Sequence, residues 1–173
     1  MQLETSRLNI RNIEVADWKS LQKIWEDFNE SKYVIYDAYK NTDEEDIKIR
    51  LSRWVDSMEK NSDHLFFAIC LKDEMIGFVT MNRRNDSYDL GYGFLQSVQG
   101  NGYATESIKA VLEYMRGFGL NKITAGTAIK NKPSVKLLHR LGFNEIGREK
   151  VSFYKDELGN DIIFTGGNFE YVF

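Results

Sequence analysis

Residues 90–106, with the sequence LGYGFLQSVQGNGYATE, decide the fold of this chain. A strand pattern ends in this stretch, a short polar loop with two glycines follows, and a helix begins at once. This order directs the unpaired N–H groups of the first helical turn, and the positive end of the helix dipole, at one point. Gly100 and Gly102 have no side chain that would keep a phosphate away from the backbone, and Ala104 is small. The stretch therefore predicts an anion site between a strand and a helix.

Two nucleotide-binding motifs do not fit this loop. A P-loop needs Lys and then Ser or Thr directly after its last glycine, whereas Tyr103 and Ala104 stand there. A dinucleotide fingerprint needs a third small residue at its spacing and an acidic residue about 20 positions further on, where the chain has Leu120 and Asn121. A nucleotide-binding α/β protein is therefore disfavoured. From spacing alone, a glycine turn that only links strand and helix is as good an interpretation as an anion site.

The composition excludes several other classes of protein. The chain has 173 residues, of which 42% are hydrophobic and 28% charged, so we expect one globular domain spanning residues 1–173. Its net charge is −3 and charges of both signs are mixed along the chain, which argues against a nucleic-acid partner. No apolar run approaches about 18 residues, so we expect no membrane span. The N-terminus lacks the pattern of a secretory signal, and we expect a cytoplasmic protein.

Metal and covalent chemistry are also disfavoured. His64 and His139 are the only histidines, and neither an HExxH nor a CxxC spacing occurs, so we predict no metal site. The single cysteine, Cys70, lies in the apolar run LFFAICL and fits a buried, inert thiol in a reducing compartment. No GxSxG elbow is present. Catalysis by a covalent serine or cysteine is therefore not expected.

Hydrophobic periodicity gives the order of elements as β-α-α-β-β-β-α-β-α-β-β, which predicts a mixed α/β sheet. The second helix is predicted to start at Thr42 as N-cap, with Glu45 completing a capping box. In the last strand, Gly166 and Gly167 predict a bulge or bend. The predicted strands are residues 5–13, 65–71, 75–81, 88–94, 122–129, 143–154 and 162–173, and the later helices are residues 103–117 and 134–141.

Several segments in fixed order resemble one family. The loop Gln99-Gly100-Asn101-Gly102-Tyr103-Ala104 resembles the pyrophosphate loop of the GNAT N-acetyltransferase superfamily, and its extension YATE resembles the form found in the RimJ/RimL-like branch. Asn131, Ser134 and the later Leu141-Gly142-Phe143 are similar to that branch's N-x-x-S…LGF segment. The predicted strand order also matches. The resemblance implies the GNAT acyl-CoA N-acyltransferase fold, with splayed central strands, and acetyl-CoA as the acyl donor.

The resemblance also implies which residues contact acetyl-CoA. Main-chain amides of Gln99, Gly100, Asn101, Gly102, Tyr103 and Ala104 would hold the pyrophosphate. Phe94 and Leu95 would hydrogen-bond the pantetheine amides, on a strand that the family splays from its neighbour, often with a bulge. Gly91 and Gly93 are compatible with such a bulge. Asn131 and Ser134 would face the cofactor arm near the sulfur. A helix N-cap is an equally good role for Asn131.

Two catalytic groups are predicted, and neither is the family's usual tyrosine acid, because Leu138 stands at that position. Ser134 is the leading candidate to orient or protonate the sulfur. Asp89 is the candidate base that relays the amine proton, since it shares a strand face with Gly91 and Gly93; a solvated strand residue is the alternative. Tyr92 lies on the opposite face and is a weaker candidate base.

The predicted function is transfer of the acetyl group of acetyl-CoA to a primary amine by direct attack in a ternary complex. The acceptor is a protein or peptide N-terminus or a small-molecule amine, with Tyr33, Tyr36 and Tyr92 as substrate contacts in an aromatic, acidic mouth. The alternative is a catalytically weak GNAT-fold protein that binds acetyl-CoA as a sensor or interaction module. We expect a monomer or a homodimer.

Overall fold

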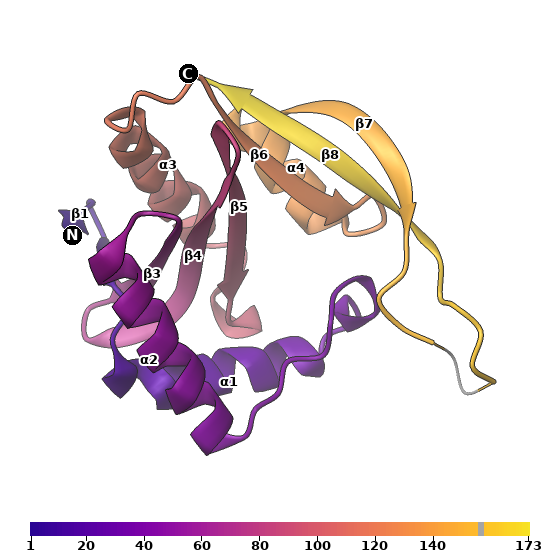
Figure 1. The fold of residues 1–173 in the computed structure, drawn as a ribbon, viewed down its shortest axis with the longest axis horizontal. Helices are drawn as coiled ribbons and strands as arrows, with labels where there is room; N and C mark the ends of the chain where they lie inside the picture. The colour runs from indigo at the N-terminus through magenta and orange to yellow at the C-terminus, as the bar shows by residue number, and fades with distance from the viewer. Residues whose placement is uncertain (156–157) are drawn as a thin grey trace.

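The computed structural model describes residues 1–155 and 158–173. The helices and strands follow the predicted order, with one short strand added at the start (Figure 1). In chain order they are β1 (Gln2–Glu4), β2 (Leu8–Asn12), α1 (Trp18–Asn29), α2 (Glu44–Lys60), β3 (His64–Leu71), β4 (Glu74–Arg84), β5 (Ser87–Phe94), α3 (Tyr103–Arg116), β6 (Lys122–Ala128), α4 (Lys132–Leu141), β7 (Asn144–Val151) and β8 (Phe164–Val172).

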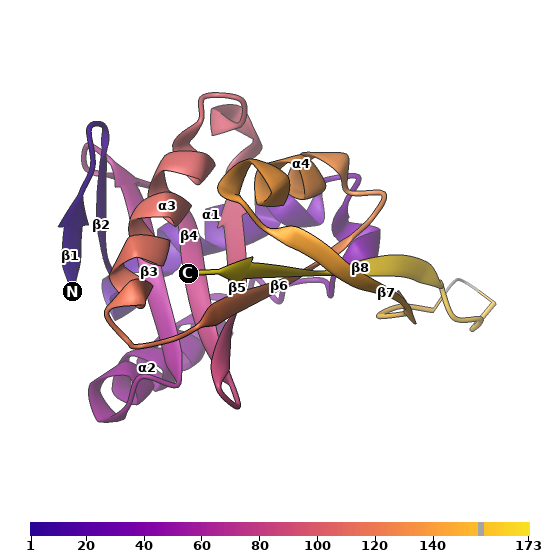
Figure 2. The ribbon, with the colours of Figure 1, turned by 90° about the horizontal axis from the view of Figure 1, so that it is seen from above.

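The strands of the described residues form one mixed sheet, which confirms the predicted fold class. Its order is β1-β2-β3-β4-β5-β6-β8-β7. Every neighbouring pair is antiparallel except β5 and β6, which run parallel. Figure 2 shows α3 and α4 together on one face of the sheet and α2 on the other. A parallel pair needs a crossover connection, and α3 supplies it between β5 and β6.

Each face of the sheet has its own hydrophobic core, built from the apolar stripes of the helices that cover it. On one face, α3 contributes Ile108, Val111 and Met115, which are fully buried against the sheet. On the other, α1 and α2 contribute residues such as Leu21 and Leu51. These are the positions that the period of 3.6 residues predicts for buried helix faces. The sheet is thus fixed from both sides.

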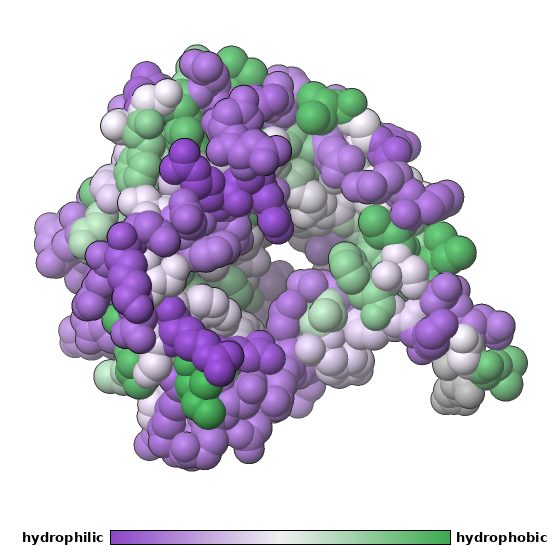
Figure 3. Space-filling model, viewed as in Figure 1, coloured by the Kyte–Doolittle hydropathy of each residue, from purple (hydrophilic) through white to green (hydrophobic). Residues whose placement is uncertain are grey.

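The sheet opens between β5 and β6. The two strands pair only at Tyr88–Ile123 and Asp89–Thr124, and beyond those pairs they diverge (Figure 1). Figure 3 shows the molecule hollowed in this region, between the part that carries α2 and the part that carries β7 and β8. The predicted splay of the central strands is confirmed, and it leaves one edge of β5 without a neighbouring strand.

β5 does not have the bulge that Gly91 and Gly93 would allow. Its pairing with β4 runs without a break from Ser87 to Phe94. The two glycines of β5 have another role, because a Cβ at Gly91 would lie 2.5 Å from Thr80 Oγ1, and one at Gly93 would lie 2.7 Å from the ring of Phe78. They make room for side chains of β4 on the face covered by α1 and α2. β5 and β6 therefore separate because two regular strands diverge, and not because β5 is bent by a bulge.

Three further predictions need correction. The N-cap of α2 is Asp43, whose carboxylate accepts from the N–H of Asp46, and not Thr42. The pairing of β7 and β8 is regular at Gly166 and Gly167, so the predicted bulge there is wrong. A Cβ at Gly167 would lie 2.6 Å from Ile129, so close packing explains that glycine. The predicted last two strands, residues 143–154 and 162–173, are longer than the observed β7 and β8. Residues 156 and 157, between them in the chain, lie outside the described residues.

Candidate functional site

The glycine loop between β5 and α3 has the backbone conformation that its sequence requires. Gly100 has a φ of +84° and Gly102 a φ of +82°, a left-handed region that favours glycine. Gly102 is the N-cap of α3, so the first N–H groups of the helix follow it directly. Gln99 and Ala104, at the two ends of the loop, line a cavity of about 230 Å³ that we call the loop cavity. Backbone donors and a helix dipole meet at its edge.

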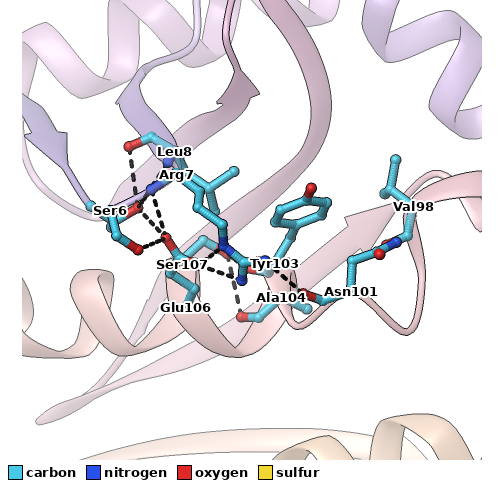
Figure 4. Close-up of polar contacts among 10 residues, drawn as sticks. Ser6, Arg7, Leu8, Val98, Asn101, Tyr103, Ala104, Glu106 and Ser107 are labelled. Atoms are coloured by element: carbon cyan, nitrogen blue, oxygen red, sulfur yellow. Dashed lines mark hydrogen bonds and ion pairs between the residues drawn. The ribbon is translucent and has the colours of Figure 1, made fainter.

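A network of polar contacts ties this loop to the turn between β1 and β2 (Figure 4). The carboxylate of Glu106 accepts from the hydroxyls of Thr5 (2.6 Å) and Ser6 (3.2 Å) and pairs with the guanidinium of Arg7 at 2.6 Å. Burial alone would raise the pKa of Glu106, but these hydrogen bonds outweigh it and hold the pKa below its usual value. The network joins residues about 100 positions apart in the chain.

Arg7 also holds the loop itself. Its Nη1 donates to the backbone oxygen of Asn101 at 3.0 Å, and its guanidinium lies over the ring of Tyr103, 4.6 Å from the centroid. The Asn101 side chain donates to the carbonyl of Val98. The side chains of Asn101 and Tyr103 are therefore engaged within the protein. The N–H of Gln99 donates to the carbonyl of Gln96 at 3.2 Å, so Gln99 is a poor candidate for the predicted amide contact to the pyrophosphate. The backbone amides from Gly100 onwards are the candidates to meet a ligand.

In β5, the backbone N–H and C=O groups of every second residue point into the opening between β5 and β6. The N–H of Leu95 donates to the carbonyl of Ile76 on β4, and the carbonyl of Leu95 accepts from Val98. Its side chain is buried in the core beneath α1 and α2. Leu95 is therefore a poor candidate for the predicted pantetheine contact. Because backbone groups of a strand alternate in direction, those of Tyr92 and Phe94 point away from β4 and into the opening.

Tyr92 and Ser134 meet across this opening. Their hydroxyl oxygens are 2.7 Å apart, although one lies on β5 and the other on α4. Burial raises the pKa of Tyr92 to about 12, so its phenol keeps its proton at neutral pH. Asn131 is the N-cap of α4 and accepts from the N–H of Ser134 at 3.4 Å, as the capping hypothesis predicts. Leu138 is fully buried in the core. Tyr92 and Ser134 thus offer hydroxyl groups that can take the place of the tyrosine acid, whose usual position is occupied by Leu138.

A second cavity, of about 420 Å³, lies on the other side of this pair. We call it the hairpin cavity because residues of β7 and β8 line it. It shares Tyr92, Ser134 and Asn131 with the loop cavity, so the two cavities meet at the hydroxyl pair. Tyr33 and Tyr36 also line the hairpin cavity.

Among the described residues, three carboxylates line the hairpin cavity: Asp37, Asp89 and Glu149. Asp37 also lines the loop cavity, together with Asp27. Asp89 accepts from the hydroxyl of Thr124 at 3.2 Å, at the last paired position of β5 and β6. Burial raises the pKa of Asp89, and the Thr124 hydrogen bond and Arg84 only partly offset that effect. Glu149, from β7, accepts from the side chain of Asn168. The cavity therefore suits a cationic or amine group.

Sequence patterns miss Arg7 and Glu149 as site residues. Arg7 lies 99 positions from Glu106, and no local spacing links the two. Glu149 looks like a solvated strand residue and becomes relevant only because β7 folds back beside β8. Cys70 is buried as predicted, and burial raises the pKa of its thiol. In residues 1–155 and 158–173, no group of three or more His, Cys, Asp or Glu side chains is arranged to hold a metal ion. None of the described helices is long and apolar enough to cross a membrane.

Comparison with known proteins gives consistent results. A family model described as an acetyltransferase (GNAT) domain matches residues 7–144. Among curated proteins, the uncharacterized N-acetyltransferase YnaD of Bacillus subtilis (strain 168) is 29% identical over 152 residues, which cover 85% of each chain.

Solved structures share the fold across nearly the whole chain. The ribosomal-protein-S5-alanine acetyltransferase of Vibrio fischeri superposes with a TM-score of 0.84 at 19% identity, covering 99% of this chain and 96% of that one. The ribosomal L7/L12 α-N-protein acetyltransferase RimL, solved in complex with coenzyme A, also gives a TM-score of 0.84, at 15% identity, covering 99% of this chain and 98% of that one.

Proposed function

The chain belongs to the GNAT acetyltransferase family, and on that premise we propose that it transfers the acetyl group of acetyl-CoA to a primary amine. The residues fit such a donor. The glycines of the loop leave backbone N–H groups open to a pyrophosphate, as argued above for Gly100 and Gly102. The loop cavity leads from there to the free edge of β5, where the backbone of Phe94 can pair with amide groups of the pantetheine arm.

One observation carries the proposal: the loop cavity, which begins at the glycine loop, and the hairpin cavity, which holds Asp89, meet at the hydroxyls of Tyr92 and Ser134. A thioester that extends from the loop reaches this junction from one side, and an amine reaches it from the other. Direct attack needs the two reactants in contact. No covalent enzyme intermediate is required.

The reaction needs two proton transfers. The amine nitrogen attacks the carbonyl carbon, the C–S bond breaks, and the electron pair leaves on the sulfur. Asp89 is our candidate to accept the amine proton, because its carboxylate lines the hairpin cavity. Ser134, hydrogen-bonded to Tyr92, is our candidate to deliver a proton to the thiolate. An N–H of β5 near residues 92–94 would stabilise the oxyanion.

The acceptor that we propose is a protein or peptide N-terminus or a small amine. The aromatic rings of Tyr33 and Tyr36 and the carboxylates of the hairpin cavity support a cationic acceptor. The test is release of free thiol from acetyl-CoA in the presence of a panel of amines, with peptides of blocked N-terminus as controls. Amine-dependent thiol release is the expected result. Tight binding of acetyl-CoA without turnover by any amine would instead support the sensor alternative.

We expect Asp89→Asn to lower kcat about 10- to 100-fold at neutral pH and to change the pH profile. The base acts as a carboxylate, and burial raises its pKa, so wild-type activity falls as the pH decreases through that raised value. The Asp89→Asn variant has no ionisable group at this position, so its activity should not show this decrease at low pH. The measurement is kcat/KM against pH.

Stability provides the control for Asp89→Asn. A raised pKa in the folded state means that folding loses stability as the pH rises from the ordinary carboxyl pKa through the raised one. The variant should therefore be at least as stable as wild type at neutral pH, by thermal melting. An unchanged pH profile at normal stability would contradict the role of Asp89 as base.

A further inference from the structure

Four lysines surround a shallow hollow beside the loop cavity. Lys32 comes from the segment after α1, Lys130 precedes α4, and Lys132 and Lys136 lie on the first turns of α4. The hollow has a volume of about 770 Å³, and all four side chains are exposed. We call these four residues the lysine rim.

No carboxylate of the described residues lines this hollow. Lys32 lies over the ring of Tyr33, and among residues 1–155 and 158–173 no ion pair involves Lys130, Lys132 or Lys136. Lysines elsewhere in the chain, such as Lys48 and Lys122, do have carboxylate partners. Because the chain has more acidic than basic residues, four lysines without a carboxylate partner in the described part of the chain are a notable local excess. Such a cluster repels itself and favours an anionic ligand.

The lysine rim adjoins the cavity that we assign to the acyl donor. Tyr33 and Pro133 line both the hollow and the loop cavity, whose other lining residues include Gln99 and Ala104 at the ends of the glycine loop. The hollow therefore borders the loop cavity, and through Tyr33 and Tyr36 it also borders the hairpin cavity.

The glycine loop itself supplies no net positive charge. Residues 99–104 include neither Lys nor Arg. Arg7, whose guanidinium donates to the backbone oxygen of Asn101, is already paired with Glu106 at 2.6 Å. The loop offers N–H dipoles, which suit the singly charged phosphates of a pyrophosphate. A phosphate monoester carries close to two negative charges at pH 7 and calls for cations.

We propose that the lysine rim binds the 3′-phosphate of the CoA nucleotide and selects acetyl-CoA over donors that lack this group. The inference rests on the proposed function, since it needs acetyl-CoA in the loop cavity. It adds a second phosphate site to the first, built from side-chain charges instead of backbone dipoles. Lysine binds phosphate as a point charge and needs no fixed geometry, which fits exposed side chains.

Calorimetric titration of the full chain with CoA and with dephospho-CoA tests this inference without turnover. We expect wild type to bind CoA about 10- to 100-fold more tightly than dephospho-CoA at low salt. In the double variant Lys132→Ala, Lys136→Ala the ratio should fall towards one, with the affinity for dephospho-CoA unchanged. The matched control is Lys19→Ala, Lys60→Ala, which removes the same charge from exposed sites elsewhere and should keep the wild-type ratio.

The outcomes distinguish failure of the proposed function from failure of the proposed phosphate site. If wild type binds neither ligand, the proposed function itself fails. If it binds both equally, or if the lysine variant loses affinity for both equally, the proposed function stands and the phosphate site is wrong. The same conclusion follows if the lysine variant alters only the KM of an acidic peptide acceptor, since the rim would then serve the acceptor. Added salt should reduce the wild-type preference, because exposed charges are screened.

Discussion

Tyr92→Phe is expected to lower kcat about 10- to 100-fold while leaving the affinity for acetyl-CoA nearly unchanged. The substitution keeps the ring and removes only the hydroxyl that lies 2.7 Å from Ser134 Oγ. Ser134 then has no partner to orient its proton or to replace a proton given to the thiolate. Steady-state kinetics and calorimetry of acetyl-CoA binding measure the two quantities separately.

The matched comparison is Ser134→Ala, alone and combined with Tyr92→Phe. If the two hydroxyls act as one unit, each single variant loses about as much activity as the double variant. A double variant that multiplies the two losses would mean that they act independently. Full activity of Tyr92→Phe would exclude the phenol from proton delivery. Loss of the hydrogen bond should cost only about 1 kcal/mol of stability, so folding does not explain a kinetic defect.

Gly77→Ala is expected to have the largest effect on stability, about 3 kcal/mol of unfolding free energy. A Cβ at Gly77 would lie 2.7 Å from the carbonyl oxygen of Gly93 and would also overlap the ring of Phe94. A backbone oxygen in a paired strand cannot move as a side chain can. The β4–β5 pair must shift, and the melting temperature should fall by roughly 6–12 °C. Acetyl-CoA affinity should fall with it, because Phe94 lies at the end of β5.

Gly147→Ala is the matched control. It also lies in a strand, but a Cβ there would have no atom within 4 Å and the backbone is not in the left-handed region. Its effect on stability should stay within about 0.5 kcal/mol. A similar melting temperature for both variants would contradict the packing argument for Gly77.

The sequence predicts those features that depend on local patterns. Apolar residues at helical spacing predict the buried faces of α1 and α3, and the alternation in residues 88–94 predicts β5. The glycine loop is recognisable because Gly100 and Gly102 mark left-handed positions within a strand–loop–helix order. Asn131 is predictable as an N-cap, since its side chain and the N–H of Ser134 lie within one helical turn.

Features that depend on distant contacts are not predictable in this way. Gly91 and Gly93 would allow a bulge in β5, but they serve the packing of Thr80 and Phe78, which a strand pattern cannot reveal. Leu95 has the right position in the sequence, but pairing with β4 uses its N–H. The contact between Tyr92 and Ser134 joins two elements 42 positions apart. Only the packing of α4 beside the free edge of β5 brings the two hydroxyls together.

The network around Glu106 has a practical consequence for handling the protein. Thr5, Ser6 and Arg7 belong to the connection between β1 and β2, yet they hold the start of α3 and the turn in front of it. Proteolytic cleavage after Arg7 would detach these three residues from β2 and weaken their hold on Glu106 and Asn101. A preparation nicked there would melt almost normally and still bind its donor poorly, so intact mass should be verified before any inactive sample is interpreted.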